Sequence, residues 1–246
     1  KKNGYKKIKK LNYIVREKML LEIKHTGIKE TIRSQVYNIL KENIISAGLE
    51  PGSQVSEQEL GDELKVSRTP VREALIHLAQ EELVEIIPQK GTYISKINIE
   101  AVEESRYMRQ ILEVDITKEA AREFPETLFF SFEENLSFQK LYLEQRNYTK
   151  LFEYDEEFHK LIYIGTNKMR IWKSIQNISG QLNRVRVLSL SDNSYELWSL
   201  IYNEHLEIFN MIKNHKVNEV QDVVIRHLER GKIHVQNLME KYKEYF

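Results

Sequence analysis

The sequence predicts a mainly α-helical protein in two parts: a small helical unit that ends in a β-hairpin, and a longer all-helical bundle. Two observations support this fold class. Residues 31–97 contain three helical patterns followed by two short alternating runs around turn residues. From Ile99 on, glycine and proline almost disappear, while apolar residues recur at helical spacing. The 246 residues carry zero net charge and include no cysteine, which excludes disulfides and thiolate metal sites.

The first 30 residues are predicted to be a basic N-terminal arm, because ten of them are Lys or Arg and only three are Asp or Glu. Lysines there are interspersed with apolar residues, which fits a short amphipathic helix before Gly27. Two interpretations stay open. The arm is either solvated and partly disordered, or it contacts a nucleic-acid backbone.

Residues 31–97 predict the elements of a winged helix-turn-helix. Apolar residues at helical spacing over 31–47 give the first helix, which ends before a Pro-Gly turn. Ser56 begins the second helix and is followed by a capping-box glutamate. Ser67 is predicted to cap the third helix. The run 83–97 alternates on both sides of a turn that contains Pro and Gly, which predicts a short β-hairpin.

Residues 98–246 predict an all-α bundle of about six helices. Asn98 is the predicted helix cap at the domain boundary, so the chain divides into an arm (1–30), a winged helix-turn-helix (31–97) and the bundle. No apolar run approaches the roughly 18 residues that span a bilayer, and we expect a cytoplasmic protein without membrane contact. The helical stretches of the bundle are 100–122, 126–146, 149–165, 168–190, 194–214 and 217–243.

The start of the third helix carries the side chains best suited to reading DNA. Arg68, Thr69 and Arg72 lie on its first turns, and recognition helices place this end against base edges and phosphates. Arginine can bond two guanine acceptors at once, so Arg68 and Arg72 are the best candidates for base contacts. The alternative is that both are ordinary exposed arginines.

The run EQELGDELKVSRTPVREALIHLAQEELVEIIPQKGTYI resembles the DNA-binding domain of the GntR family of bacterial transcription regulators. The resemblance implies that the third helix reads operator DNA in the major groove and that the wing glycine approaches the minor groove. Relatives usually have glycine at the position of Glu82. The residues that the resemblance and the helix chemistry assign to DNA are Gln58, Ser67, Arg68, Thr69, Arg72 and Gly91.

A second group of residues predicts a metal site in the bundle. Asp155 and His159 stand four residues apart on one helix and therefore face the same side. His205 and His227 follow on two later helices. Three imidazoles with one carboxylate suit zinc, nickel or similar divalent ions better than magnesium or calcium. The alternative is that these histidines are surface groups or satisfied core groups.

The bundle is similar to the FCD ligand-binding domain of the FadR subfamily, in the patterns RQILE, DEEFHKLI, EHLEIFNMI and RHLER. In that domain an Asp and three His commonly hold a divalent ion, and an inward arginine binds the carboxylate of the effector. The resemblance implies this effector role for Arg109, although an ion pair with Glu113 four residues later is equally compatible with the spacing. Arg184 and Arg186 are further candidates for anion contact.

Together these features predict a homodimeric transcription regulator, most often a repressor in such families, that binds near-palindromic double-stranded operator DNA. A small organic acid (sugar acid, hydroxy acid or amino acid) bound at the metal would control DNA affinity. Two alternatives keep the regulator but make the metal purely structural, or make the metal itself the signal. A third is a metal-dependent hydrolase with an accessory DNA-binding domain.

Overall fold

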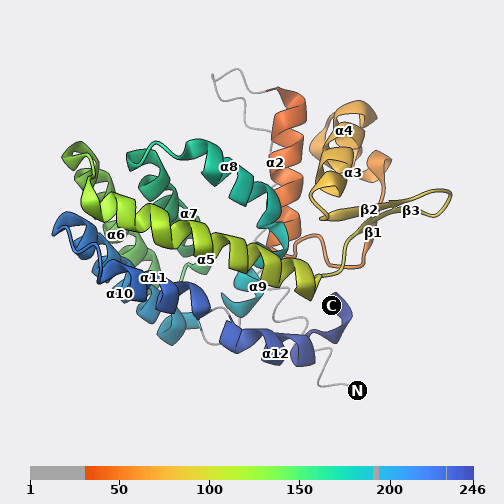
Figure 1. The fold of residues 1–246 in the computed structure, drawn as a ribbon. Coiled ribbons are helices and arrows are strands. Elements are labelled where there is room, and N and C mark those ends of the chain that lie inside the picture. Colours follow the sequence, from red (N-terminus) through yellow and green to blue (C-terminus); the bar gives the residue numbers. More distant parts are fainter. Residues whose placement is uncertain (1–30, 191–193, 231) are drawn as a thin grey trace. The chain divides into compact units, whose positions relative to one another are not determined.

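A computed structural model of the chain describes residues 31–190, 194–230 and 232–246 (Figure 1). The predicted arm at 1–30 lies outside these residues. The structure is mainly helical with one small sheet, which confirms the predicted fold class. None of the described helices combines the length and the apolar character needed to cross a membrane.

The chain forms two compact units that do not follow its linear order. The first unit combines the described residues up to Ile99 with helix α9 (Gly180–Leu190) and the C-terminal residues Leu238–Phe246. The second unit runs from Glu100 to Ser179 and continues after α9 as far as Asn237.

Three helices form the core of the first unit: α2 (Ile32–Ile45), α3 (Glu57–Leu64) and α4 (Arg68–Gln80). As predicted, the Ser56 hydroxyl accepts a hydrogen bond from the Glu59 N–H, at 3.4 Å. Ser67 stands at the N-cap position of α4 with extended dihedral angles, but its side chain makes no capping hydrogen bond. The inward apolar residues of this core include Val36, Leu40, Leu60, Leu64, Val71, Leu75 and Leu78.

The predicted hairpin is present as β2 (Val84–Ile87) and β3 (Gly91–Ile94), and it extends away from the three helices (Figure 1). A third strand, β1 (Gln54–Val55), pairs antiparallel with β3, so the strand order is β1-β3-β2. Sequence analysis did not predict β1, because two residues are too few to show alternation. Gly91 begins β3 with φ +128°, and a Cβ there would lie 2.6 Å from Gln54 Nε2.

Helix α4 ends in a Schellman turn. The N–H of Leu83 donates to the carbonyl of Leu78 at 3.0 Å, and the N–H of Glu82 donates to Ala79 at 3.1 Å. Glu82 therefore adopts a left-handed conformation with φ +59°. This conformation is strained for a residue with a Cβ, which gives a physical reason for the glycine that the family resemblance leads us to expect at this position.

The second unit is a helical bundle around aromatic side chains. Phe132 packs against Phe158 and Phe209, with ring centroids 5.2 Å and 5.4 Å apart. Two of the six predicted helical stretches are each divided. The stretch 168–190 breaks at Ser179, whose ψ of 0° and following glycine end one helix and begin the next. The helices of residues 99–241, α9 apart, are α5 (Ile99–Arg122), α6 (Phe129–Glu144), α7 (Tyr148–Gly165), α8 (Met169–Ile178), α10 (Ser194–Lys213), α11 (Val220–Glu229) and α12 (Lys232–Lys241).

Replacing Glu82 by glycine is expected to stabilise the end of α4 by about 1 kcal/mol, because glycine adopts φ > 0 without steric strain. The protection of α4 amides in native-state hydrogen exchange measures this gain. Glu82→Ala is the matched control, since it removes the carboxylate but keeps the Cβ. An equal gain from Glu82→Ala would show that charge, not backbone strain, is responsible.

Candidate metal centre and DNA-reading helix

The four predicted metal ligands converge inside the second unit. Asp155 and His159 lie on one face of α7, His205 comes from α10 and His227 from α11. One ligand atom from each residue lies within 4.8 Å of the others, and all four side chains are buried. The His205 and His227 ring centroids are 4.7 Å apart, and those of His159 and His227 are 5.1 Å apart. Residues 72 positions apart in the chain therefore surround one point.

Each of the three imidazole rings has a side-chain oxygen next to its Nδ1 atom. An oxygen acceptor at Nδ1 favours the tautomer that carries the proton there, and it leaves the lone pair of Nε2 directed to the other side. This arrangement fixes the orientation of the rings. His205 Nδ1 is hydrogen-bonded to Gln139 Oε1 at 2.8 Å, and His227 Nδ1 to Glu204 Oε2 at 3.2 Å. His159 Nδ1 lies 2.8 Å from Glu113 Oε2, close enough for an ion pair but without the geometry of a hydrogen bond.

The centre of the cluster fits a cation. The Nε2 atoms of His159 and His227 lie 3.1 Å apart, and Nε2 of His205 lies 3.7 Å from the Asp155 Oδ1 atom. With protons on Nδ1, the two close Nε2 atoms direct lone pairs toward each other, which is repulsive unless a positive charge lies between them. Three imidazole nitrogens and one carboxylate oxygen are a common ligand set for zinc and related ions. The residues present therefore fit a divalent metal ion.

Electrostatics keeps His227 neutral and its partner Glu204 ionised. Burial lowers the pKa of His227, which favours the neutral ring that a metal requires. Burial alone would raise the pKa of the Glu204 carboxyl, but hydrogen bonds from His227 and Arg230 outweigh it and lower this pKa to about 2. Arg230 Nε donates to Glu204 Oε1 at 2.8 Å, and Arg226 Nε lies 3.3 Å from the same oxygen.

Arg109 lies beside the metal cluster and is joined to it by Glu113. Its Nε donates to one oxygen of Glu113, while the other oxygen of Glu113 contacts His159. The guanidinium is buried, Nη1 lies 3.8 Å from Glu156 Oε1, and Nη2 has no hydrogen-bond partner among the described residues. Burial alone would raise the pKa of the Glu113 carboxyl, but the positive charge of Arg109 and the contact with the His159 ring hold it well below its usual value. The ion pair that the spacing allowed is thus formed, and the effector role of Arg109 stays a prediction.

The predicted base-reading arginines lie together on the surface of the first unit. Arg72 Nε is 3.0 Å from Glu57 Oε1, and Arg68 Nη2 is 3.4 Å from Glu57 Oε2. This one carboxylate of α3 places both guanidinium groups on the same side of α4. Both arginine side chains remain more than 60% exposed, so they are accessible to a partner.

The other residues assigned to DNA are more scattered. Ser67 and Thr69 are exposed at the start of α4. Gln58 is exposed on α3 and donates to Asp62 at 2.8 Å. Gly91 lies just after the hairpin turn, beside Gln54, and not at the tip itself. Contacts of these residues with DNA stay predictions.

Sequence analysis missed Glu57, Gln139 and Glu204, and it treated Glu113 only as an ion-pair partner. One signal was present: Asn135 and Gln139, four residues apart, are polar residues within the buried stripe of α6. The others gave none, because their partners lie on different helices.

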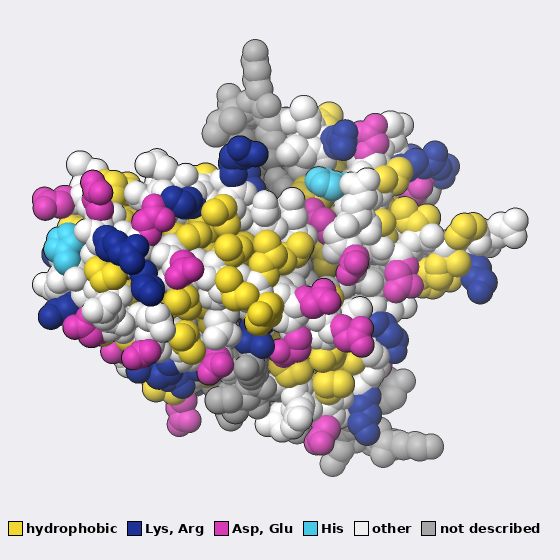
Figure 2. Space-filling view, in the orientation of Figure 1, with side chains coloured by type: hydrophobic (Ala, Val, Ile, Leu, Met, Phe, Trp, Pro, Cys, Tyr) yellow, Lys and Arg dark blue, Asp and Glu magenta, His cyan; other side chains and the backbone are white. Residues whose placement is uncertain are grey.

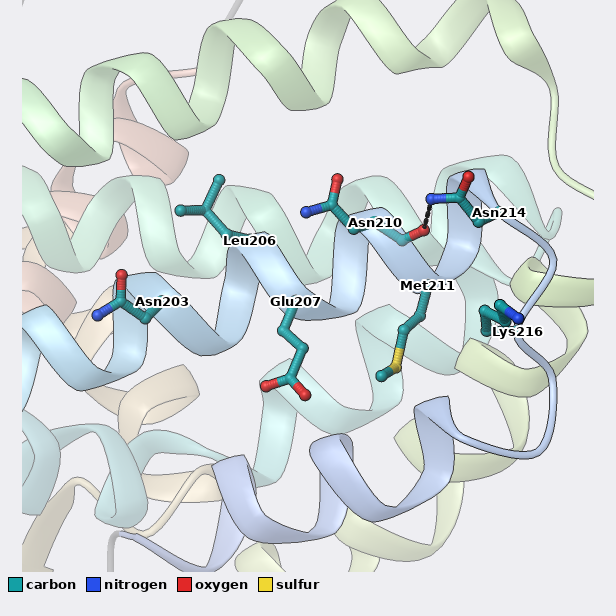
Figure 3. A pocket seen from close by; sticks show the side chains of 7 residues that line it. All are labelled: Asn203, Leu206, Glu207, Asn210, Met211, Asn214 and Lys216. Atoms are coloured by element: carbon teal, nitrogen blue, oxygen red, sulfur yellow. Dashed lines mark hydrogen bonds between the residues drawn. The ribbon is translucent and has the colours of Figure 1, made fainter.

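A surface groove along α10 is separate from the metal cluster. Asn203, Leu206 and Asn210 follow one another at helical spacing on its wall, and Asn214 Nδ2 donates to the Asn210 carbonyl at 2.7 Å (Figure 3). No predicted metal ligand lines this groove, so it is not where we place the effector. Its lining residues are Asn203, Leu206, Glu207, Asn210, Met211, Asn214 and Lys216.

Comparisons with known proteins agree with both halves of the chain. Residues 32–94 match the family model described as bacterial regulatory proteins, gntR family, and residues 104–230 match the FCD domain. The chain is 30% identical to the HTH-type transcriptional repressor RspR of Escherichia coli K12, over 88% of this chain and 94% of that protein. It is 29% identical to an HTH-type transcriptional regulator of Streptomyces ambofaciens, over 80% and 82%. The fold is similar to that of McbR/YncC from E. coli, with TM-score 0.72, 19% identity and coverage of 88% and 100%.

Replacing Glu113 by glutamine is expected to reduce the free energy of unfolding of the second unit by about 3 kcal/mol, because it leaves the buried charge of Arg109 without its closest partner. Urea denaturation followed by tryptophan fluorescence measures this, since Trp172 and Trp198 both lie in that unit. The matched control is Glu119→Gln on the same helix, where a half-exposed pair with Lys168 is worth less than about 1 kcal/mol. Equal, small effects of both changes would contradict the importance of the buried pair.

Proposed function

The chain belongs to the GntR family of bacterial regulatory proteins and carries an FCD domain, and on this premise we propose that it is a repressor controlled by a small organic acid bound at a metal ion. As a member of this family it is a DNA-binding transcription regulator and not an enzyme, so the hydrolase alternative is set aside. The observation that carries the proposal is the convergence of four buried ligand side chains next to the buried Arg109.

The metal would be held by Asp155, His159, His205 and His227, with zinc or nickel as the ions that best suit these donors. When bound, such an ion supplies a positive charge and open coordination positions that a carboxylate can occupy. Glu113, Gln139 and Glu204 hold the rings in the orientation that this requires. We propose a sugar acid, a hydroxy acid or an amino acid as the effector.

Arg109 is proposed to bind the carboxylate of the effector. Its Nη2 atom is a buried donor without a partner among the described residues, and such a group is costly unless a ligand accepts its hydrogen bond. Its Nε atom stays bonded to Glu113, which fixes the plane of the guanidinium. One arginine can therefore serve the ion pair and the effector at the same time.

A homodimer is proposed to form through the second unit. Tyr107 and Ile111 stand four residues apart on α5 and are 63% and 50% exposed. Figure 2 shows hydrophobic side chains gathered over α5, and exposed apolar patches of this kind mark interaction sites. A two-fold dimer would present two recognition helices to a near-palindromic operator. The domain limits 31–97 and 98–246 are kept as proposed boundaries.

Arg68→Ala and Arg72→Ala are each expected to weaken binding to the specific operator by about 1–3 kcal/mol, because each removes a bidentate contact to guanine. An operator selected from random DNA and a gel-shift titration at fixed salt measure the loss. The matched control is Arg122→Ala, an exposed arginine at the end of α5, which is expected to bind as the parent does. If both α4 variants keep the affinity of the parent, α4 is not the reading helix.

His205→Ala is expected to lower metal affinity at least about tenfold, because it removes one of the four ligands. Elemental analysis of protein purified without chelator measures the bound zinc or nickel, and circular dichroism confirms that the variant is folded. His215→Ala, an exposed histidine outside the cluster, is the control and should keep the metal. Undiminished metal in His205→Ala would refute the site.

A further inference from the structure

Helix α9 belongs to one domain by sequence and to the other by packing. Its residues fall within the range that matches the FCD domain, yet its side chains pack in the unit that contains the DNA-reading helices. It packs against α2, and its first residue, Gly180, lies so close to Leu83 that a Cβ would come within 2.9 Å of Leu83 Cδ2. Leu83 follows directly on the Schellman turn that ends α4. Helix α9 therefore begins at the end of the recognition helix.

Two polar side chains of α9 hold both ends of the wing. Gln181 Nε2 donates to the Glu82 carbonyl at 2.7 Å, and Arg184 Nη2 donates to the Ser95 carbonyl at 2.8 Å. The Ser95 hydroxyl also donates to the Glu82 carbonyl at 2.7 Å. Glu82 leads from α4 into β2, and Ser95 directly follows β3. We call these four residues, Gln181, Arg184, Glu82 and Ser95, the α9 clasp.

Burying the charged guanidinium of Arg184 costs free energy that packing alone would not require. The side chain is only 1% exposed, and among the described residues its hydrogen-bond partners are neutral oxygens of Ser95 and Gln181. Burial lowers its pKa to about 10, so it stays charged at neutral pH. An apolar side chain of similar size would satisfy packing at lower free energy. The hydrogen bonds of Arg184 therefore point to a role in positioning the residues at the two ends of the wing, in addition to packing α9.

On its other side, α9 continues directly from α8, which is hydrogen-bonded to two of the helices of the predicted effector site, α5 and α7. Gln176 Nε2 of α8 donates to Glu156 Oε2 of α7 at 2.8 Å, and the last residue of α8, Ile178, accepts a hydrogen bond from Ser105 of α5 at 2.6 Å. The other oxygen of Glu156 lies 3.8 Å from Arg109. Only Ser179 separates α8 from α9, and the boundary between the two compact units falls directly after it.

We propose that α9 transmits the state of the effector site to the recognition helix, with Gln181 and Arg184 as the positioning residues. Consecutive Cα atoms are about 3.8 Å apart and a single residue joins the two helices, so we expect a shift in the last turn of α8 to displace the first turn of α9. The clasp then passes this displacement to Glu82 and Ser95, which set the direction of α4 and the wing. Only the origin of the shift, an organic acid at the metal, rests on the proposed function.

Two variants weaken the clasp without creating a cavity. Gln181→Glu keeps the acceptor for Arg184 and gives it a counter-charge, but it removes the donor to the Glu82 carbonyl. Arg184→Met removes the buried charge and keeps most of the side-chain volume. Each change leaves a buried oxygen with one donor fewer, so the melting temperature of each variant is measured and DNA binding is compared well below it. Arg170→Met, at an exposed position on α8, is the matched control.

The first measurement uses the full-length chain without any effector. Both clasp variants should bind the selected operator roughly 2- to 30-fold more weakly than the parent, while their affinity for random DNA is unchanged because Arg68 and Arg72 keep their charge. Arg170→Met should match the parent on both DNAs. A merely structural role would weaken binding to both DNAs by the same factor. Parent-like operator binding by both clasp variants would overturn the proposal.

The second measurement adds Zn²⁺ with D-gluconate, L-malate or L-glutamate, one acid of each proposed class. The operator affinity of the parent should change, and that of the clasp variants should change by a smaller factor. A response of Gln181→Glu equal to that of the parent would overturn transmission through α9. If the parent responds to none of the acids, control by such acids fails, and the first measurement alone decides the role of the clasp.

Discussion

Burial of three imidazoles inside the helical bundle is the constraint on which the second unit depends. The His205 ring stacks on Phe158 with centroids 4.1 Å apart, in surroundings where an unsatisfied nitrogen would be costly. His205 and His227 avoid this cost through a hydrogen bond at Nδ1, and His159 has a carboxylate oxygen 2.8 Å from its Nδ1. The two carboxylates beside His159 and His227 are in turn held by arginines. Nε2 is then left with one role, which is to donate its lone pair. Oriented rings, ionised carboxylates and the inward Arg109 all follow from satisfying groups that cannot reach water.

Much of the fold and the ligand set could be predicted from the sequence, because both depend on local spacing. Apolar periodicity gives the helices, and the interval of four residues places Asp155 and His159 on one side of α7. The groups that orient the rings could not be predicted. Glu204 is hydrogen-bonded to His227, 23 positions away, and Gln139 to His205, 66 positions away. Only the packing of helices decides such pairs. The division at Ser179 was hidden because apolar residues continue across it.

In the first unit, the carboxylate of Glu57 forms ion pairs with Arg68 and Arg72, the two arginines that are proposed to read bases. The hydrogen bond from Arg72, with burial opposing it, lowers the pKa of Glu57 below its usual value. An exposed pair of this kind is weak, so a guanine with two acceptors can replace the carboxylate. The phosphate backbone carries the same charge whatever the DNA sequence is. Glu57, by contrast, directs both guanidinium groups toward one small area. If these arginines read bases as proposed, the pairing presents both of them to acceptors in one place.

The interleaving of the two units limits how this protein can be taken apart or recombined. A fragment that stops at residue 97 would lose α9 and the C-terminal residues Leu238–Phe246, including Tyr245, whose carbonyl accepts the Ile97 N–H at 2.7 Å. Leu83 and Ser95 would then face solvent. Chimaeras that join the winged helix-turn-helix of this chain to another sensor domain must include α9 as well. A swap made at the linear boundary near residue 97 would therefore separate residues that pack in one unit.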